Sequence, residues 1–452
     1  MLTTKEYSCL TINKSCDILE AMSKIKESAR GLVVVIDDNH KAVGVVTDGD
    51  IRKVVVENQD IRQKLSSFMN VNFTSVEEGI SRENILKLLD QKIRSVPVLD
   101  KEGKLVNLID HNYKLKSKKR LARAKAPARI SLAGGGTDYT KYFMDQGGAG
   151  LTCTIAKYSH AVLEKRDDQT IEIYSHDFRE YEKAENISKL EYNGTLDLIK
   201  AGIKLMNPDF GFRLEIGCDF PPGSGLGGSA ALLAALIGAF NELNEEKLDR
   251  YTIAEYSFEA ERLMLGISGG WQDQYSTVFG GFNYLQFNRE HNVVTPLRLE
   301  KNTFNELQEN LILCYSGKKH LGGQIQNVNQ EVTETVRTQT RKRLKEVTDE
   351  MKRTLLKNDF KNFSRLLDET WQLKKKGNPD VTNPDLNEIY DTAIKAGATS
   401  GRLLGTGGGG YFLFFIPPFH RYKVIQDLQE KGYHTEPVIF DHEGATSWSS
   451  ST

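Results

Sequence analysis

A glycine-dense loop that runs straight into an apolar segment constrains the fold of this chain more than any other feature. Residues 221–240 read PPGSGLGGSAALLAALIGAF, with glycines at positions 223, 225, 227 and 228. Glycines let a backbone turn tightly around a ligand, and a helix beginning near Ser229 would add unpaired N–H groups and the positive end of its dipole. The loop therefore predicts a phosphate-chain site, with a structural turn before a core helix as the alternative. It is not a Walker A motif, because no lysine follows the glycines.

Two further glycine loops carry the same signature. Residues 126–139 read APARISLAGGGTDY, with Arg129 and Asp138 on either side of a triple glycine, and residues 403–415 read LLGTGGGGYFLFF. Either loop alone is compatible with a structural hairpin. Three glycine loops, each next to a hydrophobic segment, indicate one cleft that is lined by backbone and holds a phosphorylated ligand.

Length and charge limit the class of protein. A chain of 452 residues has room for about three domains, and 60 basic against 61 acidic residues argue against a dedicated nucleic-acid binder. The longest apolar run, residues 230–240, is too short for a membrane span, and the N-terminus lacks a secretory signal. Five scattered cysteines without a CxxC pair indicate a reduced protein without a zinc site. We therefore expect a cytoplasmic protein with no nucleic-acid or membrane partner.

An internal repeat organises the first quarter of the chain. VVVIDDNHKAVGVVT at 33–47 recurs as SVPVLDKEGKLVNLID at 95–110, so that Asp37 aligns with Asp100 at a spacing of 63 residues. Each copy has two apolar runs joined by a polar turn, which predicts two strands, and an amphipathic stretch precedes each copy. We predict two α/β units that share one core over residues 1–115.

These units resemble a tandem pair of CBS domains, and the segment GVVTDGDIRK at 44–53 carries the resemblance. The family places a Thr and an Asp, three residues apart, on the ribose and phosphate of an adenine nucleotide, and Thr47 and Asp50 match that pattern. The second copy has Asp110 and Tyr113 at those places. The resemblance therefore implies one adenine-nucleotide site at most. A purely structural or dimerising module, which would form a homodimer through the CBS pair, is the alternative.

A basic segment follows, and the texture of the chain changes after it. Residues 116–125 are predicted to be a solvated linker rather than a site for RNA or lipid. The basic residues in and around this linker are Lys114, Lys116, Lys118, Lys119, Arg120, Arg123 and Lys125. Beyond it, glycine-rich turns alternate with strand-like runs, and the charged, proline-free stretch 305–377 is predicted to be mostly helical. We expect an α+β domain with two lobes around a cleft.

In order and spacing, the three glycine loops resemble the motifs of the GHMP kinases, the family of galactokinase, homoserine kinase, mevalonate kinase and phosphomevalonate kinase. The family motif PPGxGLGSSAA reads PPGSGLGGSAA in this chain, so that Gly228 replaces the first serine and Ser229 retains the second. The resemblance implies a ribosomal protein S5-like N-terminal lobe at 126–305 and a ferredoxin-like C-terminal lobe at 306–447. It also implies transfer of a phosphoryl group from ATP, with Mg²⁺, to a small alcohol.

The same resemblance implies residue roles. Asp273 is the catalytic aspartate and Arg129 the basic residue that offsets charge in transfer, while Ser229 and Glu261 hold the metal. The implied ATP-binding residues are Pro222, Gly223, Ser224, Gly225, Leu226, Gly227, Gly228, Ser229 and Ala230. The implied substrate-binding residues are Gly135, Gly136, Thr137, Asp138, Gln272, Gly407, Gly408 and Lys375.

Details of the motifs point to a sugar acceptor. GGGTDY at 134–139, GGWQDQY at 269–275 and the lysines at 374–376 are most similar to members that phosphorylate the anomeric hydroxyl of D-glycero-D-manno-heptose 7-phosphate, a step toward nucleotide-activated heptoses for surface polysaccharides. The lysines suit a distal sugar phosphate, with a solvated helix end as the alternative. Two other functions remain open. One is a 1-kinase of an unphosphorylated sugar such as L-fucose, and the other is an adenine-nucleotide sensor with a decayed kinase half.

Overall fold

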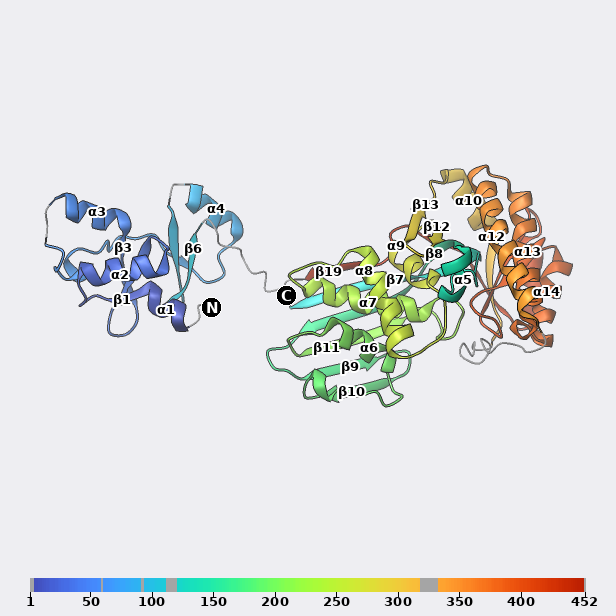
Figure 1. Cartoon of the computed structure of the whole chain (residues 1–452), viewed down its shortest axis with the longest axis horizontal. Coiled ribbons are helices and arrows are strands. Elements are labelled where there is room, and N and C mark those ends of the chain that lie inside the picture. Colours follow the sequence, from blue (N-terminus) through green and yellow to red (C-terminus); the bar gives the residue numbers. More distant parts are fainter. Residues whose placement is uncertain (1–3, 58–59, 91–92, 111–119, 318–331, 451–452) are drawn as a thin grey trace. The chain divides into compact units, whose positions relative to one another are not determined.

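The computed structural model describes residues 4–57, 60–90, 93–110, 120–317 and 332–450 (Figure 1). The chain divides into two compact units, Met1–Ser117 and Lys118–Thr452. Among the described helices, none is both long and apolar enough to cross a membrane. All five cysteines are free thiols.

Unit 1 contains two three-stranded sheets, each with its helices. The strand orders are β1-β2-β3 and β4-β5-β6, and in each sheet the first pair is parallel and the second antiparallel. The first half comprises α1 Thr4–Leu10, β1 Thr11–Asn13, α2 Ile18–Ser28, β2 Leu32–Ile36, β3 Ala42–Thr47 and α3 Asp48–Val56. The second half comprises the 3₁₀ helix Leu65–Ser67, β4 Val76–Glu77, α4 Arg82–Asp90, β5 Ser95–Leu99 and β6 Leu105–Asp110.

The repeat found in the sequence recurs in the backbone. The β2–β3 ladder shifts register at Val35 and the β5–β6 ladder shifts at Val98, 63 positions later in the numbering. The carboxylate of Asp37 accepts from the N–H groups two and four residues on, and Asp100 does the same. Buried residues of both halves, including Val34 and Leu108, form one hydrophobic cluster. The predicted pair of α/β units is therefore present. Each half also has a hydrophobic cluster of its own, so the shared cluster joins two cores rather than forming a single one.

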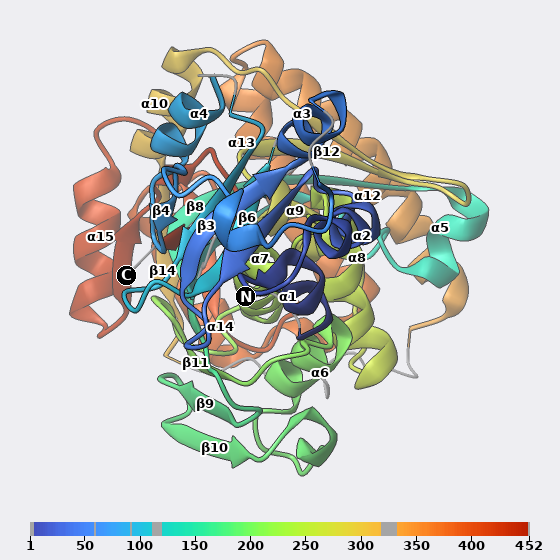
Figure 2. The same ribbon diagram turned by 90° about the vertical axis from the view of Figure 1, so that its left-hand side faces the viewer.

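Unit 2 is built on a nine-stranded sheet. The central order is β10-β9-β11-β8-β12-β13, while β7 pairs with β8 and β19, and β18 pairs with β8. Figure 1 and Figure 2 both show β9 and β10 at one edge of this sheet. Its strands are β7 Leu121–Ala133, β8 Gly148–Lys165, β9 Ile171–Ser175, β10 Glu180–Ala184, β11 Phe212–Cys218, β12 Phe282–Phe287, β13 Asn292–Pro296, β18 Phe440–Asp441 and β19 Thr446–Ser450.

The helices of this lobe pack around a central apolar helix, α7 (Gly228–Leu243). Every residue from Ala230 to Asn241 of α7 is buried, as expected for a helix that is apolar on all faces. Strand β7 presents small buried side chains such as Ala124 to it, and these permit a close approach near Gly238. The other helices are α5 Thr140–Gln146, the 3₁₀ helix Ile187–Lys189, α6 Asp197–Met206, α8 Arg250–Phe258, the π-helical turn Glu259–Met264 and α9 Gln272–Phe279.

The second lobe has a four-stranded antiparallel sheet in the order β15-β16-β14-β17. Its strands are β14 Leu311–Tyr315, β15 Ser400–Leu403, β16 Tyr411–Phe415 and β17 His434–Pro437. Its helices are α10 Lys301–Asn310, α12 Glu334–Leu356, α13 Phe360–Gly377, the 3₁₀ helix Pro379–Val381, α14 Pro384–Ala396 and α15 Arg421–Glu430. The two-lobed α+β architecture implied by the resemblance is thus present.

The structure corrects three sequence-based boundaries. Leu121–Lys125, predicted to be linker, is the first part of β7 and pairs with β19, because its small residues face the core while Arg123 points outward. Because β19 belongs to the nine-stranded sheet, the end of the predicted C-terminal lobe is part of the N-terminal lobe. Within the predicted helical stretch 305–377, the apolar segment Leu311–Tyr315 forms the strand β14. Residues 114 and 116–119 of the basic segment lie outside the described residues.

Candidate active site

Two cavities meet in unit 2. Cavity A, of about 400 Å³, lies beside Asp138 and the first glycine loop. Cavity B, of about 680 Å³, lies along the middle glycine loop and the start of α7. The residues that line both cavities are Arg129, Arg262, Ser268, Asp273, Gly405 and Thr406. A group bound in one cavity can therefore reach a group bound in the other across this shared wall.

The three glycine loops converge on that wall because glycines permit the contact. Gly225 has a positive φ of 80°, and a Cβ there would lie 2.9 Å from the carbonyl oxygen of Leu404. A Cβ on Gly405 would lie 2.6 Å from the Cα of Gly225. The backbone N–H of Arg129 donates to the carbonyl of Leu226 at 3.0 Å, which attaches the first loop to the middle one. The structure therefore brings the three sequence motifs together.

Arg129 and Asp273 form the centre of the shared wall. The Nε and Nη2 of Arg129, on β7, donate to the two carboxylate oxygens of Asp273, on α9, at 2.8 and 2.6 Å. Nη1 of Arg129 donates to the carbonyl of Gly225 at 2.6 Å. The Arg129 side chain is 4% exposed and that of Asp273 is 19% exposed. This bidentate pair fixes the orientation of the carboxylate.

Asp138 lies on the cavity A side of this pair. Its Oδ1 accepts from the N–H of Gly136 at 3.0 Å and its Oδ2 accepts from the N–H of Gln272 at 3.1 Å. A Cβ on Gly270 would lie 1.9 Å from that Oδ2, so only glycine fits there. Burial, with Asp273 as a second cause, raises the pKa of Asp138. The side-chain oxygen of Gln272 accepts from the hydroxyl of Ser131 at 3.1 Å.

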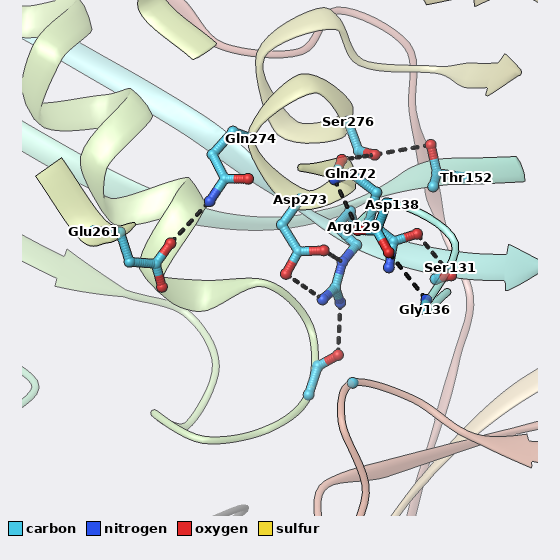
Figure 3. Close-up of polar contacts among 12 residues, drawn as sticks. Arg129, Ser131, Gly136, Asp138, Thr152, Glu261, Gln272, Asp273, Gln274 and Ser276 are labelled. Carbon is cyan, nitrogen blue, oxygen red and sulfur yellow. Dashed lines mark hydrogen bonds and ion pairs between the residues drawn. The ribbon is translucent and has the colours of Figure 1, made fainter. Parts of the chain in front are cut away.

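Glu261 lies on the cavity B side, in the π-helical turn that follows α8. Gln274 donates to its Oε2 at 2.8 Å, and Ser229, at the start of α7, lines the same cavity. Burial raises the pKa of Glu261. Figure 3 shows the Arg129–Asp273 pair between Glu261 on one side and Asp138 on the other. Ser229 and Glu261 thus offer two hard oxygen ligands that fit a magnesium ion.

The second lobe adds a cationic wall to cavity A. Arg337 and Arg341 come from one face of α12, Lys374 from α13 and Arg402 from β15. Nη1 of Arg402 donates to the carbonyl of Leu132 at 2.6 Å, and its buried Nε has no hydrogen-bond partner among the described residues. Burial, and secondarily Arg129, lower the pKa of Arg402 to about 10. Burial, followed by Arg402 and Arg129, also lowers the pKa of Lys374 well below its usual value.

Most predicted site residues line these cavities, and some do not. Gly135, Gly136, Asp138 and Gln272 line cavity A, and all the predicted ATP-binding residues except Leu226 and Ala230 line cavity B. The exceptions have physical reasons. The side chains of Leu226 and Ala230 are fully buried in the core. The hydroxyl of Thr137 is buried against the carbonyls of Gly134 and Ala149.

Two corrections concern the substrate-binding residues of the second lobe. Lys375 does not line cavity A; its ammonium lies 5.4 Å from the ring centroid of Trp371 and 5.5 Å from that of Tyr390. Its neighbour Lys374 lines the cavity instead. In the third glycine loop, Gly405 and Thr406 line both cavities. Gly407 lies against Val381, and the N–H of Gly408 donates to the carbonyl of Val381 at 2.9 Å.

In unit 1, Thr47 and Asp50 contact each other. The Thr47 hydroxyl donates to the Asp50 carboxylate at 2.7 Å, the Thr47 N–H donates to the same oxygen, and the Asp50 N–H donates to the Thr47 hydroxyl. This reciprocal arrangement caps the N-terminus of α3. In the second copy, the Asp110 carboxylate forms an ion pair with Arg30, and Tyr113 lies outside the described residues.

Comparison with known families places these features in a class. Residues 194–281 match the GHMP kinases N terminal domain and residues 351–434 match the GHMP kinases C terminal domain. Residues 4–57 and 65–112 match the CBS domain. The matched segments include the middle glycine loop, Glu261, Asp273 and α13, which carry much of the site.

Individual proteins similar to this chain include sugar kinases of the same family. The chain is 35% identical over 333 residues to D-glycero-alpha-D-manno-heptose 7-phosphate kinase of Campylobacter jejuni, covering 72% of this chain and 98% of that protein. The crystal structure of a D-glycero-D-manno-heptose 1-phosphate kinase from Bacteroides thetaiotaomicron matches with a TM-score of 0.63 and 30% identity, over 73% of this chain and 100% of that chain. L-fucokinase/L-fucose-1-P guanylyltransferase of Bacteroides fragilis is 26% identical over 64% of this chain and 34% of that protein.

The fold, the three glycine loops and the arginine–aspartate pair therefore define a phosphotransferase, and the chain belongs to the GHMP kinases, with a pair of CBS domains. Within that family it is a sugar kinase, an enzyme that transfers a phosphoryl group from ATP to an alcohol. These findings confirm the family, the fold class and the enzyme class predicted from the sequence.

Proposed function

We propose that this enzyme phosphorylates the anomeric hydroxyl of D-glycero-D-manno-heptose 7-phosphate, in the synthesis of nucleotide-activated heptose for surface polysaccharide. Cavity B takes Mg·ATP and cavity A takes the sugar phosphate. The identity to the Campylobacter jejuni heptose 7-phosphate kinase supports the acceptor. The observation that carries the proposal is the cationic wall of cavity A, because it calls for an anion distal to the reacting hydroxyl.

The acidic and basic side chains that line cavity A explain why an anion would bind there. Two carboxylates line it: Asp273 is already paired with Arg129, and Asp138 is held by backbone N–H groups. Arg337, Arg341, Lys374 and Arg402 bring four basic side chains, of which Arg337 and Arg341 also lie 3.6 and 3.7 Å from the carboxylate of Glu334. Burial and neighbouring cations lower the pKa of Lys374 and of Arg402, so a bound anion would favour the charged forms of both. A phosphate dianion would restore the balance and satisfy the buried Nε of Arg402.

The chemistry follows from the shared wall. The glycine loop at 223–229 holds the triphosphate through backbone N–H groups, and Asp138 orients the sugar by accepting from a hydroxyl. Asp273, held by Arg129, faces the acceptor hydroxyl and takes its proton as the oxygen attacks the γ-phosphorus. Mg²⁺ held by Ser229 and Glu261 would neutralise charge on the β- and γ-phosphates.

The test is ADP release with Mg·ATP against the heptose 7-phosphate, mannose 6-phosphate, mannose, L-fucose and galactose, with phosphorus NMR of the product. We expect a strong preference for the heptose phosphate and a new anomeric phosphate signal. Turnover of a free hexose alone contradicts the distal-phosphate site and favours a 1-kinase of an unphosphorylated sugar. ATP binding without turnover of any sugar favours the nucleotide-sensor function.

Variants of the cationic wall sharpen the test. A hydrogen bond to a charged group contributes about 1.5–3 kcal/mol, so Arg402→Met should reduce the preference for mannose 6-phosphate over mannose by about 10- to 150-fold. Arg341→Met, on the separate helix α12, provides a second, more exposed change. Arg365→Met, which removes an exposed cation from α13, is the matched control. An unchanged preference in both wall variants contradicts the assignment.

We also propose that the CBS pair binds an adenine nucleotide at Thr47 and Asp50. Their present contacts cap α3, so a ribose would have to displace the hydroxyl of Thr47 from the carboxylate of Asp50. Calorimetry of the full chain with AMP, ADP and ATP tests this, with Asp50→Asn to separate the site from cavity B. Identical heats in the two proteins would favour a purely structural module, and dimer formation through the pair stays a prediction for ultracentrifugation.

A further inference from the structure

Arg262 occupies a place in the site that no motif predicted. It follows Glu261 in the π-helical turn and lines both cavities. Its side chain is 10% exposed. A Cβ on Gly269 would lie 2.2 Å from the guanidinium carbon, so the glycine leaves the space that this side chain fills. The cation is therefore held in the wall through which a phosphoryl group must pass from cavity B to cavity A.

The contacts of Arg262 use one corner of its guanidinium. Nη1 donates to the carbonyls of Ile267 and Ser268 at 3.2 and 3.0 Å and lies 3.3 Å from Oε1 of Glu261. The buried Nε has no hydrogen-bond partner among the described residues. Nε and Nη2 form the edge of a guanidinium that binds two oxygens of a phosphate side by side. The protein thus anchors Arg262 by one corner and leaves Nε without a protein acceptor in the part of the chain that the structure describes.

Arg129 is engaged in the opposite way. Its Nε and Nη2 hold Asp273, and its Nη1 holds the carbonyl of Gly225. The bidentate edge that could grip a phosphoryl group is therefore already used to orient a carboxylate. A second cation that reaches the reacting phosphorus has to come from elsewhere in the shared wall, and Arg262 is placed there.

We propose that Arg262 is a further catalytic residue, whose Nε–Nη2 edge binds two oxygens of the phosphoryl group during transfer, while Arg129 acts chiefly as the positioning residue of Asp273. In the step, the bond from the γ-phosphorus to the bridging oxygen of ADP breaks and the bond to the acceptor oxygen forms. The acceptor proton passes to Asp273, and ADP leaves. The proposal rests on the kinase activity and on the roles of the two cavities, and it is independent of which sugar is the acceptor.

Binding of a phosphoryl mimic tests this without an acceptor. Mg·ADP is titrated with and without aluminium fluoride, which occupies the place of the transferred group. We expect Arg262→Met to bind Mg·ADP within about threefold of wild type but to lose about tenfold or more of the affinity gained from aluminium fluoride. A gain equal to that of wild type overturns the proposal. Arg213→Met, which removes an exposed arginine on β11, is the control for losing one surface cation.

A kinetic readout separates catalysis from loop support, since Arg262 also holds the carbonyls of Ile267 and Ser268. With any sugar that wild type phosphorylates, the turnover ratio between ATP and its γ-thio analogue is compared for wild type and Arg262→Lys. Loss of a contact to a non-bridging oxygen should slow ATP more than the thio analogue, and the ratio should fall about tenfold. Equal slowing of both nucleotides would assign Arg262 a structural role instead. Lysine retains the charge and is the variant to use if methionine unfolds the chain.

Discussion

Replacing Asp273 with Asn tests the centre of the site most directly. The amide has the shape of the carboxylate but carries no charge and has one acceptor oxygen in place of two. In the native pair, both carboxylate oxygens accept from Arg129, at 2.8 and 2.6 Å. In the variant, one of these donors would face an amide NH₂ group. The buried arginine keeps its charge but loses its charged partner.

Two magnitudes follow. Breaking a buried ion pair destabilises a protein by about 3–5 kcal/mol, and because Asp273 is 19% exposed and Asn retains one hydrogen bond, we expect a loss of about 2 kcal/mol. Loss of the group that takes the proton should lower kcat by about 100-fold or more. ATP affinity should stay within about threefold, because the glycine loop and Ser229 are unchanged.

The assays are coupled ADP release for kcat, calorimetry for ATP and urea unfolding for stability. Asp145→Asn is the matched control, because Asp145 also accepts from an arginine, Arg289, but in an exposed pair. It should leave all three quantities nearly unchanged. If Asp273→Asn folds and retains kcat within about threefold, Asp273 is not the residue that handles the proton, and the proposed proton transfer is wrong.

Two further changes probe the surroundings of that pair. Gly270→Ala should reduce kcat/KM for the sugar by about tenfold or more, because its Cβ would displace the Asp138 carboxylate; steady-state kinetics with unchanged ATP affinity is the check, and wild-type kinetics would refute it. Burial lowers the pKa of Lys374 in the folded chain below its usual value of 10.5. Between the folded and the unfolded pKa, the unfolded chain therefore binds a proton that the folded chain lacks. Wild type should therefore gain stability relative to Lys374→Met as the pH rises from 7 to 10 in urea unfolding. If the free energy of unfolding of wild type stays constant or falls relative to that of Lys374→Met over this pH range, the lowered pKa is contradicted.

Local sequence rules predicted those parts of the fold that repeat or that demand glycine. The 63-residue spacing survives in the structure down to the position of a register shift in each hairpin, because the same polar turn follows the same apolar run. The glycine loops are visible in the sequence because a Cβ at Gly225 or Gly405 would collide with the facing loop. In the hairpins the constraint acts within a few residues of the motif, whereas in the glycine loops it comes from a distant loop and shows in the sequence because only glycine satisfies it.

The missed elements depend on partners far away in the chain. β14 is five apolar residues that become a strand because they pair with β16 and β17. The start of β7 looks like a basic linker by composition, yet three alanines, at 122, 124 and 126, alternate with Arg123 and Lys125, which is the period of a half-buried strand. Its pairing partner, β19, lies more than 300 residues later in the sequence. The high density of basic residues favoured the linker prediction, although the alternation of small and basic residues predicts a strand.

The site shows the same division. Glu261 and Asp273 lie in motifs, whereas Arg337 and Arg341 lie on α12 with no glycine loop nearby to mark them. Arg262 lies next to Glu261 and close to the glycines at 266, 269 and 270, but the motif assigns it no role. The choice of Lys374 rather than Lys375 could have been predicted from the sequence. The buried residues of α13 include Phe363, Leu367 and Trp371, and the helical period continues to position 374 rather than 375. A turn of about 100° per residue carries Lys375 away from the cavity and over the Trp371 ring.

The cationic wall of cavity A lowers the stability of the free enzyme and favours the binding of an anion. Burial opposes the charged forms of Lys374 and Arg402, so holding both in the free enzyme lowers its stability. Satisfied carbonyls of Leu403 and Gly405, which accept from Lys374 at 3.0 and 2.6 Å, keep that ammonium in place and tie the third glycine loop to α13. In the proposed function, a dianion bound in cavity A would relieve the repulsion between these basic groups. An acceptor without a phosphate group would not, so the binding free energy should distinguish a sugar phosphate from a free sugar.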